Sequence, residues 1–240
     1  MKKIGIVGGV GWPATAAYYA GLCEAARAHC PGGSPPMMVE SLDMRETLGA
    51  RGEPGRAESW RTFDGLFRDA LNRLDAGGCA IAAIASATPH ARLSSIMRGT
   101  AIPVVSILDA AAAALRGQTE KQALVLGTAV TTQNGLFDAP LRAIGLTPIG
   151  PPSEADVAGL SALLNAYFYT ARAREGRGPL IDYCRQRIGE PARSIVVLGC
   201  TDLAPAFPER AGAVVFEADG ITFVDTMAAH VQAILAAALP

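Results

Sequence analysis

The sequence predicts an α/β fold of two similar, pseudo-symmetric halves, each a parallel sheet covered by helices, with a cleft between them. Short apolar runs typical of buried strands alternate with segments of helical periodicity along the chain. Such alternation favours parallel sheets covered on both faces. The order strand, turn, helix starts twice, at Ile4 and at Ala123. We therefore expect residues 1–98 plus 213–240 to form the first half and residues 99–212 the second.

The expected strands of the first half are short apolar runs bounded by polar residues, glycine or proline. They lie at residues 4–7, 37–40 and 79–85, with a last one at 214–216. A helix over 13–28 follows the first turn, because proline is tolerated at the start of a helix. A polar, glycine-rich loop is expected over 41–57. Apolar residues at helical spacing predict another helix over 60–74.

The second half repeats this order after an alanine-rich helix over 109–116. Its expected strands are again short and apolar, at residues 102–106, 123–127, 147–149 and 195–198. Helical segments of this half are expected at residues 133–144, 153–174 and 181–187. A helix over 223–238 closes the chain and belongs to the first half. The strand that ends at Leu198 is followed directly by Gly199 and Cys200.

Composition excludes several classes of function. The chain has 21 basic and 22 acidic residues, which argues against nucleic acid or a membrane surface as a partner. Its five cysteines form no metal-binding spacing, so we expect no metal and a reduced, cytoplasmic setting. The amino-terminal residues enter a strand without a long apolar segment, so we expect no signal peptide.

Cys200 and Ser86 are the candidate catalytic residues. Each follows the end of an expected buried strand, and ligands of open α/β sheets bind outside the carboxyl ends of strands. The alternative for Cys200 is a small buried hydrophobe, the usual fate of a free cysteine. Thr201 and Asp202 favour the site, because these polar residues cannot continue a buried strand.

The turn that contains Gly9 fits a dinucleotide fingerprint between a strand and a helix. Two features argue against a nucleotide. No acidic residue stands about 20 positions further on, and Pro13 removes an amide donor from the first helical turn. The glycines suit equally well a loop pressed against a small anionic substrate.

Arg45, Thr128 and Thr131 are candidate ligands for carboxylates. An arginine can bind a carboxylate in bidentate fashion, and threonine hydroxyls beside a helix start can assist. The alternatives are a solvated loop with a local contact from Arg45 to Asp43 or Glu46, and simple helix capping by the threonines.

Several motifs together resemble the aspartate/glutamate racemase family over nearly the whole chain. They are Gly8-Gly9-Val10-Gly11 with Thr15 and Tyr18-Tyr19, Asp43-Met44-Arg45, Ala87-Thr88-Pro89-His90 and Leu198-Gly199-Cys200-Thr201-Asp202. The resemblance implies a homodimeric isomerase without pyridoxal phosphate, metal or other cofactor. Two groups at opposite faces of the substrate Cα would then exchange its proton, with Cys200 at one face and Ser86 at the other. The two are expected to face each other across the cleft.

The resemblance also assigns substrate contacts. Arg45 would reach the distal carboxylate of a small acidic substrate, and Thr88, Thr128 and Thr201 with nearby amides would hold the α-carboxylate. Gly9, Ala87 and Thr131 complete the expected site. Helix amides near Thr201 are expected to lower the pKa of Cys200.

The first half departs from the family pattern. Relatives usually have Cys-Asn-Thr or Thr-Asn-Thr where this chain has Ser86-Ala87-Thr88. A hydroxyl is a far weaker acid than a thiol, and Ala87 cannot hold the substrate as an asparagine would. Two alternatives therefore stand beside the racemase: a single-cysteine decarboxylase or isomerase of a small dicarboxylate, and a small-anion-binding homologue with weakened catalysis.

Overall fold

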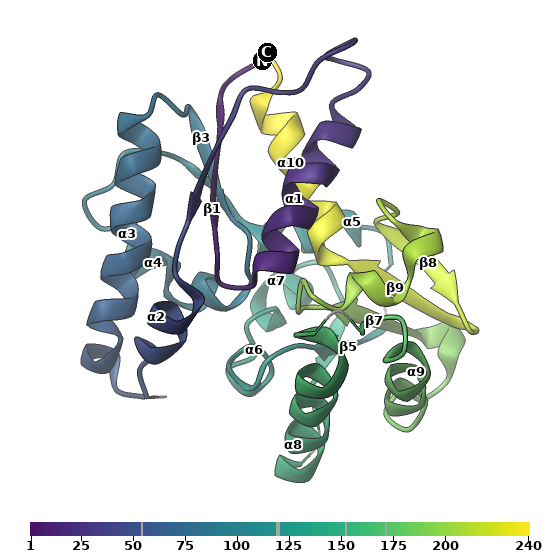
Figure 1. Ribbon diagram of the computed structural model, residues 1–240. Coiled ribbons are helices and arrows are strands. Elements are labelled where there is room, and N and C mark those ends of the chain that lie inside the picture. Colours follow the sequence, from purple (N-terminus) through teal and green to yellow (C-terminus); the bar gives the residue numbers. More distant parts are fainter. Residues whose placement is uncertain (54, 119–120, 152, 171) are drawn as a thin grey trace. The chain divides into compact units, whose positions relative to one another are not determined.

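A computed structural model describes residues 1–53, 55–118, 121–151, 153–170 and 172–240 of the chain. These residues form two compact units, Met1–Ser106 with Val231–Pro240, and Ile107–His230. In both, parallel strands alternate with helices (Figure 1), which confirms the predicted α/β class with sheets in two halves. Pro54 of the expected loop and Ala171 of an expected helix lie outside the described residues.

The first unit holds a four-stranded parallel sheet in the order β2-β1-β3-β4. Its strands are β1 (Ile4–Gly8), β2 (Met37–Ser41), β3 (Ile81–Ile84) and β4 (Val104–Val105). Its helices are α1 (Trp12–Ala25), α2 (Met44–Gly49), α3 (Arg61–Ala76) and α4 (Leu93–Ile96), with 3-10 turns η1 (Ala57–Trp60) and η2 (Thr88–Arg92).

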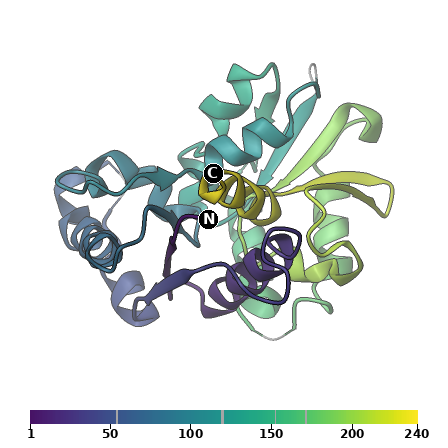
Figure 2. The ribbon, with the colours of Figure 1, turned by 90° about the horizontal axis from the view of Figure 1, so that it is seen from above.

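Helices cover both faces of this first sheet. Figures 1 and 2 show α3 on one face and α1 on the other, with the end of α10 (Thr226–Ala238) beside α1. The α3 helix buries an apolar stripe of Phe63, Phe67 and Leu71 at helical spacing. The amide of Lys2 donates to the carbonyl of Ala238 at 2.8 Å, which joins the two chain ends.

The second unit holds a five-stranded sheet in the order β6-β5-β7-β9-β8. Its strands are β5 (Gln122–Leu126), β6 (Thr147–Ile149), β7 (Ser194–Leu198), β8 (Val215–Ala218) and β9 (Ile221–Asp225). All pairs are parallel except β8–β9, an antiparallel hairpin. The remaining helices are α5 (Ile107–Ala114), α6 (Ala129–Gln133), α7 (Asp138–Ala143), α8 (Glu154–Leu163), the π-helical turn η3 (Leu164–Phe168) and α9 (Arg177–Arg185), with 3-10 turns η4 (Pro191–Arg193), η5 (Ala204–Ala206) and η6 (Pro208–Arg210).

Alternate residues of the central strands define the core that surrounds Cys200. Even-numbered residues of β5 and β7, such as Leu126 and Leu198, join one buried cluster with side chains of α8, η3 and α9. Successive side chains of a strand point to opposite faces. Cys200 keeps this parity and belongs to the same cluster.

Several expected elements were wrong in detail. The loop over 41–57 contains α2, because the Asp43 carboxylate accepts the amides of Arg45 and Glu46 and so caps a helix. The helix expected over 133–144 is two short helices, with Gly135 at a positive φ of 55° between them. In place of one helix over 153–174, the structure has α8 followed directly by the π-helical turn η3.

The boundary between the two units near the carboxyl terminus also differs from the predicted one at residue 213. The sequence suggested a helix from Phe223, but residues 221–225 form β9, which pairs with β7. Five largely apolar residues beside a helix have no period that separates strand from helix. Because of this pairing residues 213–230 lie in the second unit, whereas β4 pairs with β3 and lies in the first. No described helix is long and apolar enough to cross a membrane.

Candidate active site

In the first unit, the carboxyl ends of neighbouring parallel strands carry three of the expected residues. Gly9 directly follows β1, Arg45 lies in α2 shortly after β2, and Ser86 lies two residues beyond the end of β3. Because these strands are adjacent in the order β2-β1-β3, the sheet brings all three residues to one edge. This is the edge at which parallel α/β sheets bind ligands.

Gly9 lets the loops after β1 and β2 approach each other. Its φ is +85°, and a Cβ at this position would overlap the carbonyl oxygen of Leu42. Its amide already donates to Thr15 Oγ1 at 2.9 Å. Gly9 therefore serves local packing, and its amide has a partner within the loop and helix that it joins.

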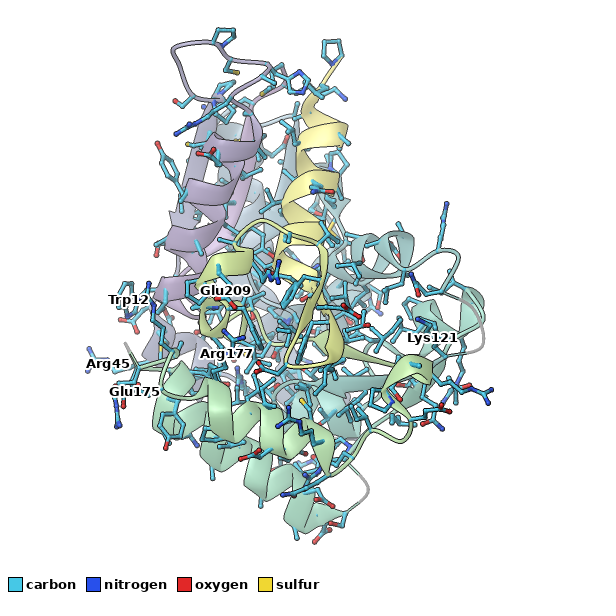
Figure 3. The ribbon with its side chains drawn as sticks, turned by 90° about the vertical axis from the view of Figure 1, so that its right-hand side faces the viewer. Trp12, Arg45, Lys121, Glu175, Arg177 and Glu209 are labelled. Atoms are coloured by element: carbon cyan, nitrogen blue, oxygen red, sulfur yellow. The ribbon has the colours of Figure 1, made fainter. Side chains whose placement is uncertain are left out.

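Arg45 is an exposed residue in the first turn of α2 (Figure 3). Its backbone amide donates to Asp43 Oδ1 at 2.7 Å. The amides of Glu46 and Arg45, together with the charge of Arg45, hold the pKa of Asp43 below its ordinary value. The local contact expected as an alternative is thus present through the backbone, while the guanidinium projects from the helix.

Ser86, Ala87 and Thr88 lie at the end of β3. Ser86 is half-buried, and Ala87 and Thr88 are buried. The Ser86 carbonyl oxygen lies 3.0 Å from Nδ1 of His90, which fixes the turn from strand to η2. The serine hydroxyl is consequently placed at the edge by a buried framework.

Cys200 occupies the corresponding place in the second unit, two residues beyond the end of β7. Gly199 lets the end of β7 lie close against the end of β5, because a Cβ there would lie 2.8 Å from the carbonyl oxygen of Leu126. The cysteine side chain is 7% exposed. Its thiol donates to Asp202 Oδ2 across 3.7 Å.

The environment of Cys200 favours the protonated thiol. Burial, followed by the nearby Asp202 carboxylate, raises the pKa of Cys200 well above its ordinary value of 9.0. Hydrogen bonds from the Asp202 amide and the Tyr169 side chain act in the opposite direction. The expected lowering by helix amides is wrong, because Cys200 is followed by a turn and the short η5, with no α-helix start at Thr201.

Asp202 is a buried carboxyl that the sequence analysis did not place in the site. Burial raises its pKa from 3.8 to about 6, and the hydrogen bond from Cys200 opposes this shift. Its Oδ1 is buried and has no hydrogen-bond partner among the described residues. An acidic residue two positions after a candidate cysteine was visible in the sequence, but its burial was not.

The three candidate threonines of the second unit, Thr128, Thr131 and Thr201, have different environments. Thr128 caps α6 by accepting the amide of Thr131 at 3.3 Å, and the two hydroxyls lie 3.1 Å apart. The capping role weighed above is therefore present. Thr201 is buried beside Cys200. No group of three or more potential metal ligands occurs among the described side chains.

Each unit is built mainly from parallel strands and helices, and each has a candidate proton-transfer residue beyond its third strand. This arrangement is typical of two-halved α/β enzymes. A family model described as Asp/Glu/Hydantoin racemase matches residues 7–234. The protein belongs to this racemase family. Racemases are isomerases, so it is an enzyme of the isomerase class.

Solved structures share the fold. An aspartate racemase homologue from Pyrococcus horikoshii OT3 is 24% identical, with a TM-score of 0.75 and 99% of both chains covered. Aspartate racemase from Picrophilus torridus is 19% identical, with a TM-score of 0.76 over 99% of this chain and 94% of that one. A mutant of arylmalonate decarboxylase in the liganded form is 16% identical, with a TM-score of 0.52 over 98% of this chain and 92% of that one.

Proposed function

We propose that the protein is a cofactor-independent racemase of a small acidic amino acid of the aspartate or glutamate type. Cys200 is the principal acid and base, and Ser86 stands at the opposite face of the substrate Cα. The observation that carries the proposal is positional: each residue lies two positions beyond the third strand of its sheet. Membership of the racemase family supports the reaction type.

The proposed proton path begins at the thiol. Cys200 rests protonated, and its proton moves to Asp202 Oδ2, which accepts its hydrogen bond. This transfer relocates one negative charge from carboxylate to sulfur without adding a second buried charge, which limits its desolvation cost. The thiolate then removes the Cα proton and becomes a thiol, and the resulting carbanion takes a proton at its other face from the Ser86 hydroxyl. Exchange with solvent then returns a proton to Ser86 and removes the proton held by Asp202. In the reverse direction, the Cys200 thiol is the donor.

The same proposal assigns the substrate contacts. The exposed guanidinium of Arg45 binds the distal carboxylate. Thr88, Thr128 and Thr201 hold the α-carboxylate, and Gly9, Ala87 and Thr131 shape the surrounding loops.

Deuterium exchange tests the reaction directly. Each enantiomer of aspartate and glutamate is incubated with the enzyme in D2O, and Cα deuteration is followed by NMR while chiral chromatography follows inversion. We expect exchange with at least one acidic amino acid and none with the Cys200→Ala variant. Absence of exchange with all four substrates, or equal exchange with the variant, would contradict the proposal.

A single-cysteine decarboxylase is the second candidate function. The raised pKa of Cys200 favours it, because a resting thiol is suited to protonating a carbanion from one face. The fold shared with arylmalonate decarboxylase is compatible with this chemistry. Release of CO2 from a substituted malonate, with no Cα exchange of amino acids, would establish this function instead.

Assembly and location are proposed on the family resemblance. We propose a homodimer in the cytoplasm. Light scattering coupled to size-exclusion chromatography measures the oligomer, and a monomeric mass at micromolar concentration would contradict the first part. Fractionation of cells that express the protein tests the cytoplasmic location.

A further inference from the structure

The π-helical turn η3 brings Tyr169 to the candidate catalytic thiol. We propose that Tyr169 is a positioning residue for Cys200, whose hydroxyl donates a hydrogen bond to Sγ and stabilises the negative charge when the thiol loses its proton. This inference rests on the proposed acid–base role of Cys200. It assigns a function to a residue that the sequence motifs leave out.

The backbone of η3 sets the direction of Tyr169. The Tyr169 amide donates to the carbonyl of Leu164 at 3.0 Å, five residues earlier, in place of the four-residue step of an α-helix. One residue inserted in this way turns the following side chains by roughly 100° about the helix axis. The Tyr169 side chain hydrogen-bonds to Cys200 in this register.

Packing holds the turn in place on the Cys200 side. Leu164 and Phe168 are buried and belong to the same hydrophobic cluster as Cys200. Gly176 allows the start of α9 to press against η3, since a Cβ there would lie 2.7 Å from Tyr167 Cβ and 2.9 Å from Phe168 Cζ. The backbone before Tyr169 is therefore clamped, while its own side chain is 42% exposed.

The donors and acceptors around Sγ have different effects on the thiolate. The Asp202 carboxylate accepts the hydrogen bond of the thiol and, while it is ionised, repels a negative charge on sulfur. The Asp202 amide and the Tyr169 side chain oppose that repulsion. Of these two donors, Tyr169 is the one that mutation can remove without altering the backbone. Once the proton has moved to Asp202, the Tyr169 hydroxyl would donate its hydrogen bond to the negatively charged sulfur.

Alkylation of Cys200 tests this role without any assay of turnover. The full-length Tyr169→Phe variant keeps the ring and loses the hydroxyl, a conservative change at an exposed residue. Iodoacetamide labelling from pH 7 to pH 10 is followed by peptide mass spectrometry, with the half-exposed Cys23 of the same chain as an internal reference. We expect the labelling rate of Cys200, normalised to that of Cys23, to be about tenfold slower in Tyr169→Phe than in the wild type, because a hydrogen bond to a charged group is lost.

Tyr167→Phe is the matched control. The Tyr167 ring packs under the Arg172 guanidinium at 5.4 Å, a contact that phenylalanine retains. This variant should label Cys200 at the wild-type rate, and circular dichroism should give equal melting temperatures for all three proteins. In racemisation assays, Tyr169→Phe should lower kcat about tenfold near pH 8 with KM unchanged, and the deficit should shrink as pH rises.

Equal Cys200 labelling rates for the two variants would overturn the proposal. So would loss of turnover in Tyr169→Phe with wild-type labelling and pH profile, since Tyr169 would then act elsewhere. If wild-type protein racemises no amino acid, the proposed function fails, while the labelling experiment still decides whether Tyr169 tunes the thiol.

Discussion

The two units have the same arrangement of their first three strands and different chemistry at the corresponding edge. Strand order is β2-β1-β3 in one and β6-β5-β7 in the other, and each third strand is followed two residues later by Ser86 or Cys200. Ser86 is followed by the small Ala87 and by the hydroxyl of Thr88. Cys200 is followed by the hydroxyl of Thr201 and by the buried carboxyl of Asp202. The framework is thus repeated, while the thiol and the buried carboxyl that we propose to move the proton lie in the second unit.

The difference is physical as well as chemical. Serine needs a stronger partner to lose its proton, whereas a thiol titrates several pH units lower. The second unit also surrounds its thiol with an acceptor, Asp202 Oδ2, and with two hydrogen-bond donors that partly offset the burial favouring the protonated thiol. Two edges with the same strand order are therefore expected to differ in proton transfer, and the rates of mutant enzymes can measure that difference.

The largest expected effect comes from removing the thiol. Cys200→Ala should lower racemisation in both directions by about a thousandfold or more, the range of general acid–base catalysis. Ser86→Ala should cost far less, with one direction affected more than the other. Initial rates from each enantiomer measure both variants, and thermal melting confirms that they fold. Equal losses in the two variants would contradict the proposed inequality.

The second effect concerns stability at the Cys200 edge. Because burial raises the pKa of Asp202 to about 6, the folded protein holds a proton that the unfolded chain releases between pH 3.8 and about 6. The free energy of unfolding therefore falls as pH rises through this range, by up to about 3 kcal/mol. Asp202→Asn should be more stable than wild type by that order at pH 8, with the difference lost near pH 4.

Urea unfolding at pH 4, 6 and 8 measures this dependence. Asp182→Asn, an exposed aspartate of α9 in the same unit, is the matched control and should show no such trend. A stability gain in Asp202→Asn that is independent of pH would show that the carboxyl charge is not its source.

The third experiment makes the first edge resemble the second. Ser86→Cys should raise inversion of the enantiomer whose hydrogen faces Ser86 by about tenfold, because a thiol is a better base than a hydroxyl. Ser86→Cys with Ala87→Asn should gain more, since positioning and proton transfer act together. Ser94→Cys, an exposed position in α4, controls for an added thiol. No gain in either Ser86 variant would favour the decarboxylase.

The smallest effect is expected at Arg45. Arg45→Ala should raise KM for an acidic substrate about fivefold, because an exposed ion pair contributes up to about 1 kcal/mol. The KM of a neutral amino acid should not change. Arg61→Ala, another exposed arginine of the first unit, is the control. Equal changes for acidic and neutral substrates would place Arg45 outside the binding site.

Much of the framework could be predicted because it follows from local patterns. Short apolar runs such as 4–7 and 195–198 are stable when they are buried as strands. Their alternation with helices leads to parallel sheets. Since strand ends are also where such sheets bind ligands, Ser86 and Cys200 could be selected as candidates before any coordinates existed. The β9 strand was missed because its residues also continue the apolar pattern of α10.

The sequence by itself determined the fold class, the family and the two residues that lie beyond the third strands, since periodicity and motif are properties of neighbouring residues. Only the tertiary structure decided the direction of the Cys200 pKa shift, the burial of Asp202 and the approach of Tyr169. These depend on which distant segments exclude water from one sulfur atom. Tyr169 lies 31 positions before Cys200 in the chain (200 minus 169), and only the packing of η3 on the sheet brings the two together.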